Sequence, residues 1–92
     1  MVYVVERHLA GLERGELLNG LRRLQRSTQQ PTHDTTRVRY LGSTIVIGDD
    51  ACYCQFEAPS PVAVIDVNRR VGLPVDRIVA AVPVTPTKGE TR

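Results

Sequence analysis

The chain has 92 residues, enough for one domain and too few for two. Its formal net charge is only +2 and it contains no basic run, so we do not expect nucleic acid as a partner. No apolar stretch reaches the roughly 18 residues of a membrane helix, and the first residues lack the pattern of a signal peptide. We therefore expect a cytoplasmic protein with no membrane partner.

The first part of the chain predicts a strand followed by a helix. Residues 2–8 are β-branched and aromatic, as is typical of a strand, and residues 9–12 form a turn. A helical pattern begins near Glu13. Its apolar stripe comprises Leu17, Leu18, Leu21 and Leu24. Gly15 and Gly20 each weaken this helix by about 1 kcal/mol, so its packing must compensate.

The middle of the chain predicts a loop and a β-hairpin. Residues 27–36 are polar and include a proline, which indicates a mobile loop. Residues 37–47 and 51–57 have β character. The turn between them is supplied by Gly48, Asp49 and Asp50.

The last part predicts a second helix and a fourth strand. Ser60 is a good N-cap, and Pro61 suits the first helical position. The apolar stripe of this helix is Val64, Val67 and Val71, and Gly72 ends it. Residues 75–84 read as a strand, and Pro83 near its end and Pro86 just beyond it suit a sheet edge. Residues 85–92 read as a disordered tail.

The order of these elements is strand-helix-strand-strand-helix-strand. It predicts an α+β fold of ferredoxin-like topology, with residues 1–84 as a single domain. In this fold both helices cover one face of a four-stranded antiparallel sheet and leave the other face open. So small a domain gains stability by oligomerisation, and we expect a homodimer that buries the open face.

Alternation along the strands separates the two faces of the sheet. The face toward the helices should be the apolar one, made of Val5, Leu41, Ile45, Cys54 and Phe56. The open face then carries Glu6, His8, Tyr40, Tyr53, Gln55 and Glu57. Carboxylates in a partly buried face need cations or a metal as partners.

Glu6 and His8 are the first candidates for metal ligands. They lie at i and i+2 of one strand, so both can point into one pocket. Imidazole and carboxylate together suit zinc, nickel, copper or iron. Because the first and third strands are neighbours, we expect Glu57 to approach the same end of the sheet and complete the site. The alternative is a solvated strand end, or pairing with Arg7.

Cys52 and Cys54 form a Cys-X-Cys pair that allows two interpretations. Their thiolates could bind a soft metal, or they could be small core residues. We expect reduced, buried and slowly reacting thiols, since Cα atoms about 6.6–6.8 Å apart along a strand suit a disulfide poorly. The other histidine, His33, falls in the polar loop, where we expect it to be solvated.

The sequence identifies no catalytic site. Glu6 or His8 could act as a general base, but no residue pattern indicates a substrate. One alternative to metal binding is a small enzyme of the dimeric α+β barrel type. Its organic ligand would lie in a pocket on the open face, lined by Tyr40, Tyr53, Glu6 and His8. Another alternative is an interaction module without a small ligand.

Four motifs extend over nearly the whole chain: Val5-Glu6-Arg7, Leu9-Ala10-Gly11, Phe56-Glu57-Ala58-Pro59, and Gly72 to Ile78. Together they resemble a family of small bacterial nickel-binding proteins, formerly a domain family of unknown function. Ala10 and Glu13-Arg14 depart from the pattern of that family at the start of the first helix, where proline and Thr-Pro are usual.

The resemblance implies a ferredoxin-like dimer, joined through its sheets, that binds nickel through nitrogen and oxygen ligands. It does not locate those ligands in this chain. We therefore predict a homodimer that binds a divalent transition metal, nickel in the first place, for sequestration, storage or homeostasis. Glu6, His8 and Glu57 are its predicted ligands, and the sequence leaves open whether the protein is also an enzyme.

Overall fold

The computed structural model describes residues 1–29 and 38–86. Its elements are β1 (Val2–His8), α1 (Arg14–Gln29), β2 (Arg39–Val46), a short 3-10 turn (Ile47–Asp49), β3 (Ala51–Glu57), α2 (Pro61–Arg70) and β4 (Arg77–Ala81). This order confirms the predicted α+β fold of ferredoxin-like type.

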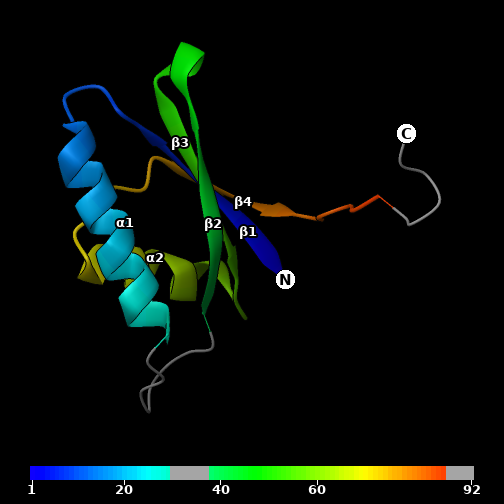
Figure 1. Cartoon of the computed structure of the whole chain (residues 1–92). Coiled ribbons are helices and arrows are strands. Elements are labelled where there is room, and N and C mark those ends of the chain that lie inside the picture. The colour runs from blue at the N-terminus through cyan, green and yellow to red at the C-terminus, as the bar shows by residue number, and fades with distance from the viewer. Residues whose placement is uncertain (30–37, 87–92) are drawn as a thin grey trace.

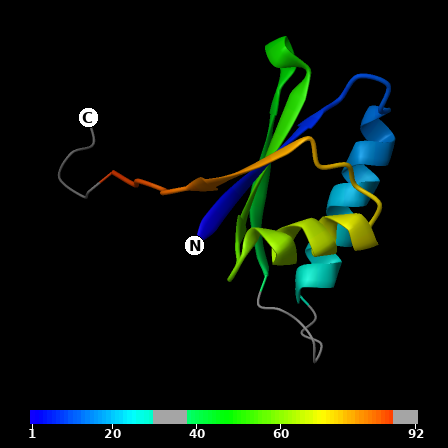
Figure 2. The ribbon, with the colours of Figure 1, turned by 180° about the vertical axis from the view of Figure 1, so that it is seen from behind.

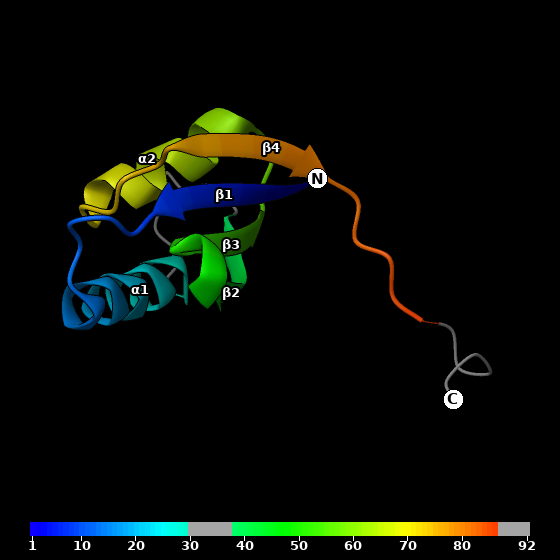
Figure 3. The ribbon, with the colours of Figure 1, turned by 90° about the horizontal axis from the view of Figure 1, so that it is seen from above.

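The sheet has four antiparallel strands in the order β2-β3-β1-β4, so β1 and β3 are central and β4 is an edge, as predicted. Figure 3 shows the strands in this order, from β4 at the top to β2 at the bottom. The opposite views in Figures 1 and 2 place α1 and α2 on the same side of the sheet. No helix within residues 1–29 and 38–86 covers the other face, which we call the open face (Figure 3). None of the helices in the described ranges is long and apolar enough to cross a bilayer.

The core lies between the sheet and the two helices. Val5 and Phe56 contribute from the central strands, Leu17 and Leu24 from α1, and Val64 from α2, and all five are at most 1% exposed. Burying an aliphatic or aromatic side chain of this size contributes about 1.5–3 kcal/mol each. The predicted core positions Val5, Cys54 and Phe56 are therefore confirmed.

A β-bulge in β2 overturns two predicted side-chain directions. The pairing of β2 with β3 shifts between Tyr40 and Gly42, so one extra residue stands in β2. Tyr40 consequently faces the helices, with its ring centroid 5.4 Å from that of Phe56. Leu41, predicted for the core, is 44% exposed. Strict alternation failed here because a bulge moves every side chain before it to the other face.

The ends of the elements differ modestly from the sequence prediction. α1 continues through residues 27–29, which we had placed in the polar loop, and Thr28 donates its hydroxyl hydrogen to the Leu24 carbonyl at 3.1 Å. β4 ends at Ala81, earlier than predicted. The rest of the predicted loop, with His33, and most of the predicted tail lie outside the described residues.

The start of α2 follows the predicted capping. Ser60 has extended backbone, and its hydroxyl accepts a hydrogen bond from the Ala63 amide at 3.2 Å. Pro61 occupies the first turn, where a missing amide hydrogen costs nothing. Past the end of the helix, Gly72 has a φ of 78°, a left-handed conformation that other residues rarely adopt.

Candidate metal site on the open face and a buried thiol cluster

The structure brings Glu6 and His8 together on the open face of β1. Glu6 Oε2 lies 3.9 Å from His8 Nε2. The His8 side chain is 62% exposed and that of Glu6 18%, so the imidazole is accessible while the carboxylate is largely enclosed by its neighbours. One nitrogen and one carboxylate donor thus point to the same region, as their spacing predicted.

Two neighbours enclose the Glu6 carboxylate. Arg77, which pairs with Glu6 in the register of β4, brings Nη1 to 3.6 Å from Oε1. Tyr53, opposite Glu6 in β3, places its hydroxyl 3.5 Å from Oε2. Desolvation and the charge of Glu6 raise the pKa of Tyr53, which keeps the phenol protonated. A metal ion at Glu6 would have to compete with Arg77.

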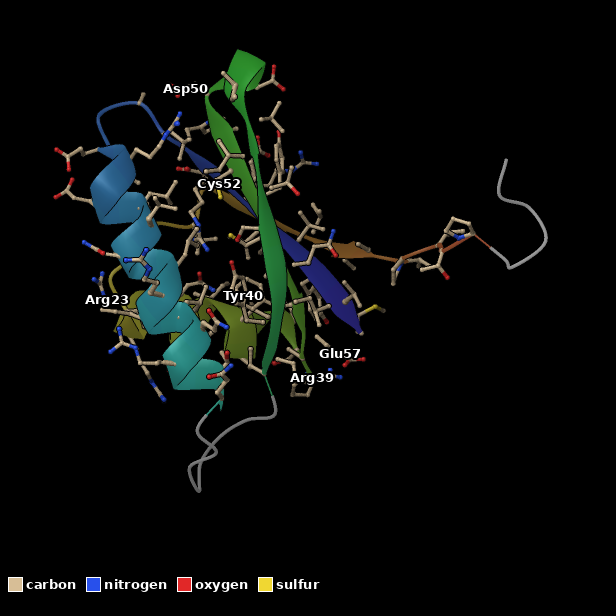
Figure 4. The ribbon with its side chains drawn as sticks, viewed as in Figure 1. Arg23, Arg39, Tyr40, Asp50, Cys52 and Glu57 are labelled. Carbon is tan, nitrogen blue, oxygen red and sulfur yellow. The ribbon has the colours of Figure 1, made fainter. Side chains whose placement is uncertain are left out.

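Glu57 lies at the other end of the sheet. In the antiparallel register it is opposite Val2, whereas Tyr53 is opposite Glu6. Four positions along a strand correspond to about 13 Å. Glu57 instead accepts a hydrogen bond from Arg39 Nη1 at 2.8 Å. Figure 4 shows Arg39 and Glu57 together, far from Asp50 at the opposite end of β3. Within one chain, Glu57 therefore does not approach Glu6 and His8.

A single chain offers an incomplete set of donors for a transition metal. No group of three or more His, Cys, Asp and Glu side chains suited to hold a metal occurs within residues 1–29 and 38–86. Glu6 and His8 fit two positions of an octahedral ion, and the remaining positions would fall to water or to a second chain. The fit is therefore partial.

A buried polar cluster on the opposite face of the sheet was not predicted, and Arg7 is at its centre. Arg7 is 0% exposed. Nη1 donates to the Pro74 carbonyl at 2.7 Å, and Nη2 donates to Asn68 Oδ1 at 2.7 Å and to Cys54 Sγ at 3.3 Å. Strand alternation could have located Arg7, since it shares its face with Val5. Charged residues are mostly exposed to solvent, so Arg7 was not predicted to be buried.

Cys54 makes hydrogen bonds on several sides. Its sulfur lies 2.8 Å from Ser43 Oγ and 3.7 Å from Cys52 Sγ, and Ser43 also contacts the hydroxyl of Tyr40. Both cysteines are free thiols and 0% exposed, as predicted. Figure 4 shows Cys52 and Tyr40 on the side of the sheet that faces the helices.

This environment separates the acidities of the two thiols. The hydrogen bond from Cys52, the charge of Arg7 and the Ser43 hydroxyl lower the pKa of Cys54 to about 6, although burial opposes them. The same sulfur–sulfur hydrogen bond, together with burial, raises the pKa of Cys52 above its ordinary value. Cys54 is therefore the more acidic thiol of the pair, and it lies next to the guanidinium of Arg7.

Comparison with protein families gives a decisive match. A family model described as nickel responsive protein SCO4226-like matches residues 3–80. The chain belongs to this family. No curated protein matches it by sequence. In the Val5-Glu6-Arg7 motif by which the chain resembles the family, the structure places Glu6 on the open face and Arg7 in the core.

A solved structure has the same fold as this chain. It is the crystal structure of SCO4226 from Streptomyces coelicolor A3(2), with a TM-score of 0.63 and 20% sequence identity. The match covers 94% of this chain and 100% of the other. At this identity the likeness supports the shared fold and carries no ligand from one protein to the other.

Proposed function

We propose that this protein is a homodimeric, cytoplasmic metal-binding protein whose physiological ion is nickel. The observation that carries the proposal is the pair of Glu6 and His8, 3.9 Å apart on an uncovered sheet face, in a chain of a nickel responsive family. Nitrogen and oxygen donors of this kind suit nickel. Its role would be sequestration, storage or homeostasis of the ion.

The open sheet face supports the dimer. It presents Val4 and Val79 between charged groups at both ends, and Val79 is 37% exposed. Two copies packed face to face would remove these side chains from water, at about 25 cal/mol for each Å² of apolar surface buried. In a dimer with a two-fold axis, the same sheet face of both chains would form the interface.

The second copy would complete the metal site. Glu6 and His8 lie toward one end of the sheet and Glu57 at the other. If the strands of two facing sheets run in opposite directions, Glu57 of the second copy lies over Glu6 and His8 of the first. We therefore keep Glu57 as the third ligand, contributed across the dimer, where nickel would replace its bond to Arg39.

Nickel titration by calorimetry tests the ligand set. His8→Ala and Glu6→Gln should each lower the affinity at least tenfold, which corresponds to about 1.4 kcal/mol. Glu16→Gln makes the same chemical change on an exposed position of α1 and should leave nickel binding unchanged. Unchanged nickel affinity in a folded His8→Ala protein would contradict the proposed site.

A mixing experiment tests the contribution of Glu57 across the dimer. His8→Ala and Glu57→Gln proteins should each bind nickel poorly. After subunit exchange, each mixed dimer contains one site with all three ligands intact, so about a quarter of the sites should recover full affinity. No recovery, or sedimentation of the wild type as a monomer at micromolar concentration, would contradict a shared site.

The organic-ligand alternative is weakened by the bulge in β2. The pocket imagined for it included Tyr40, which faces the helices and packs against Phe56. A cavity of about 310 Å³ lies elsewhere, lined by Ile65, Arg69, Leu73, Pro74 and Val75. Elemental and absorption analysis of the purified protein separates the two functions, since nickel supports the first and a co-purified chromophore supports the second.

A further inference from the structure

Arg7 brings a positive charge into the core, and its neutral hydrogen-bond partners Asn68 and Pro74 do not balance that charge. None of the ion pairs among the described residues involves Arg7, and its Nε has no hydrogen-bond partner there. A guanidinium stays charged, and an isolated buried charge is very costly. The ionisable groups within reach of this cation in the core are sulfur atoms, since Nη2 contacts Cys54 and Cys54 contacts Cys52.

We propose that Cys52 and Cys54, balanced by Arg7, form a binding site for one soft monovalent cation, Cu(I), separate from the nickel site. The two sites use opposite faces of the sheet: Glu6 and His8 lie on the open face, and the thiols lie on the face covered by the helices. They can therefore be tested independently.

The spacing of the sulfur atoms fits a chelate. Cys52 Sγ and Cys54 Sγ are 3.7 Å apart. With sulfur–metal bonds of about 2.3 Å, two sulfurs lie roughly 4.0 Å apart in a three-coordinate site and roughly 4.6 Å apart in a linear two-coordinate site. The pair must therefore open by less than about 1 Å to hold the ion. Ser43 Oγ, 2.8 Å from Cys54 Sγ, is the nearest further donor.

The charge of the site selects a monovalent ion. Binding breaks the S–H bonds of the pair, forms two sulfur–metal bonds and releases the protons to solvent. Two thiolates, one Cu(I) and the guanidinium of Arg7 then sum to zero, which suits a fully buried site. A divalent ion would leave one uncompensated positive charge in the core. Thiolate ligands also favour Cu(I) over harder ions.

The site is closed in the folded state, because both cysteines are 0% exposed. The cation must enter through a local opening of the helices from the sheet, and we expect slow association. Once bound, it stabilises the native state by mass action. Slow uptake with a large rise in thermal stability is therefore the expected behaviour.

Titration of the full chain with Ag(I), followed by native mass spectrometry, tests the site directly. We expect one silver ion per chain, a higher melting temperature, and retention of silver in a tenfold excess of Ni(II). Cu(I) competition against a chromophoric chelator should give the same stoichiometry. Cys52→Ser and Cys54→Ser change one atom each, and either should weaken Ag(I) binding at least a hundredfold.

Further variants separate this site from the nickel site and from loss of fold. His8→Ala should bind silver like the wild type. Arg7→Lys retains the charge and should bind silver within about threefold of the wild type, whereas Arg7→Met should lose at least tenfold. Silver binding that survives in both serine variants would overturn the proposal, as would equal binding in Arg7→Met and Arg7→Lys, both folded by circular dichroism.

Discussion

The guanidinium of Arg7 lies 2.7 Å from Asn68 Oδ1 and joins the central strand β1 to the buried face of α2. Asn68 is itself fixed, because its Nδ2 donates to the Val64 carbonyl one turn earlier in α2 at 2.8 Å. Both residues are 0% exposed. The helix is thus held to the sheet by directional polar bonds as well as by apolar contact, and hydrogen bonds to charged groups contribute about 1.5–3 kcal/mol.

Removing the Arg7 side chain should be strongly destabilising. Arg7→Ala leaves a cavity, leaves the acceptors on Asn68 and Pro74 without their donor, and deprives Cys54 of its cation. We expect a loss of about 3–5 kcal/mol in the free energy of unfolding, measured in urea. Arg22→Ala, on the exposed side of α1, should change it by less than about 0.5 kcal/mol. Equal stabilities of the two variants would contradict the role of Arg7.

The cysteine pair should give stability a defined pH dependence. The pKa of Cys54, about 6 in the folded chain, lies below the ordinary thiol value of 9.0. Between these two pH values the folded chain therefore binds fewer protons than the unfolded chain. Stability therefore rises with pH in this window and is lost as pH falls through about 6. Above the ordinary value the raised pKa of Cys52 reverses the slope, because only the unfolded chain loses both protons.

The double variant Cys52→Ser/Cys54→Ser isolates this effect. Urea unfolding of both proteins from pH about 5 to about 10 gives the difference in the free energy of unfolding at each pH. The difference should be largest near pH 9 and smaller on both sides. A difference that does not vary with pH would show that the pair titrates alike in the folded and unfolded chains.

Both thiols should react slowly in the native protein. Cys52 and Cys54 have no exposed surface, so a bulky thiol reagent reaches them only after local opening. Labelling should be on the order of a hundredfold slower than in denaturant, where both react at once. Rapid labelling of the folded chain would contradict their placement between the sheet and the helices.

The two glycines within α1 should respond oppositely to alanine. A Cβ on Gly20 would lie 2.5 Å from Leu73 Cδ2, so Gly20→Ala forces a buried side chain to move and should cost about 1–3 kcal/mol. A Cβ on Gly15 would meet the mobile Glu13 carboxylate at 3.1 Å. Gly15→Ala should therefore stabilise the protein by up to about 1 kcal/mol. Thermal unfolding of both variants distinguishes them, and stabilisation by both would contradict close packing at Gly20.

Much of this architecture is determined locally, and the sequence was sufficient for it. The order of the elements follows from short-range signals, such as Ser60 with Pro61 at the start of α2 and Gly72 after its end. The proximity of Glu6 and His8 follows from the period of a single strand, which no distant contact alters.

The tertiary structure decided whatever depends on how one strand pairs with another. The register of β1 with β3 places Glu57 beside Val2, far from Glu6, and a single extra residue in β2 turns Tyr40 toward the helices. The register between two strands depends on the packing of the whole sheet and its helices, so it cannot be predicted from the sequence of one strand.

Arg7 shows the same limit in the core. Alternation alone places it beside Val5, but its charge is tolerable there only because Pro74, Asn68 and Cys54, from three other parts of the chain, meet its nitrogens. These partners lie dozens of residues from Arg7 in the sequence, and only folding brings them together. Their hydrogen bonds to Arg7 could therefore be identified only from the tertiary structure.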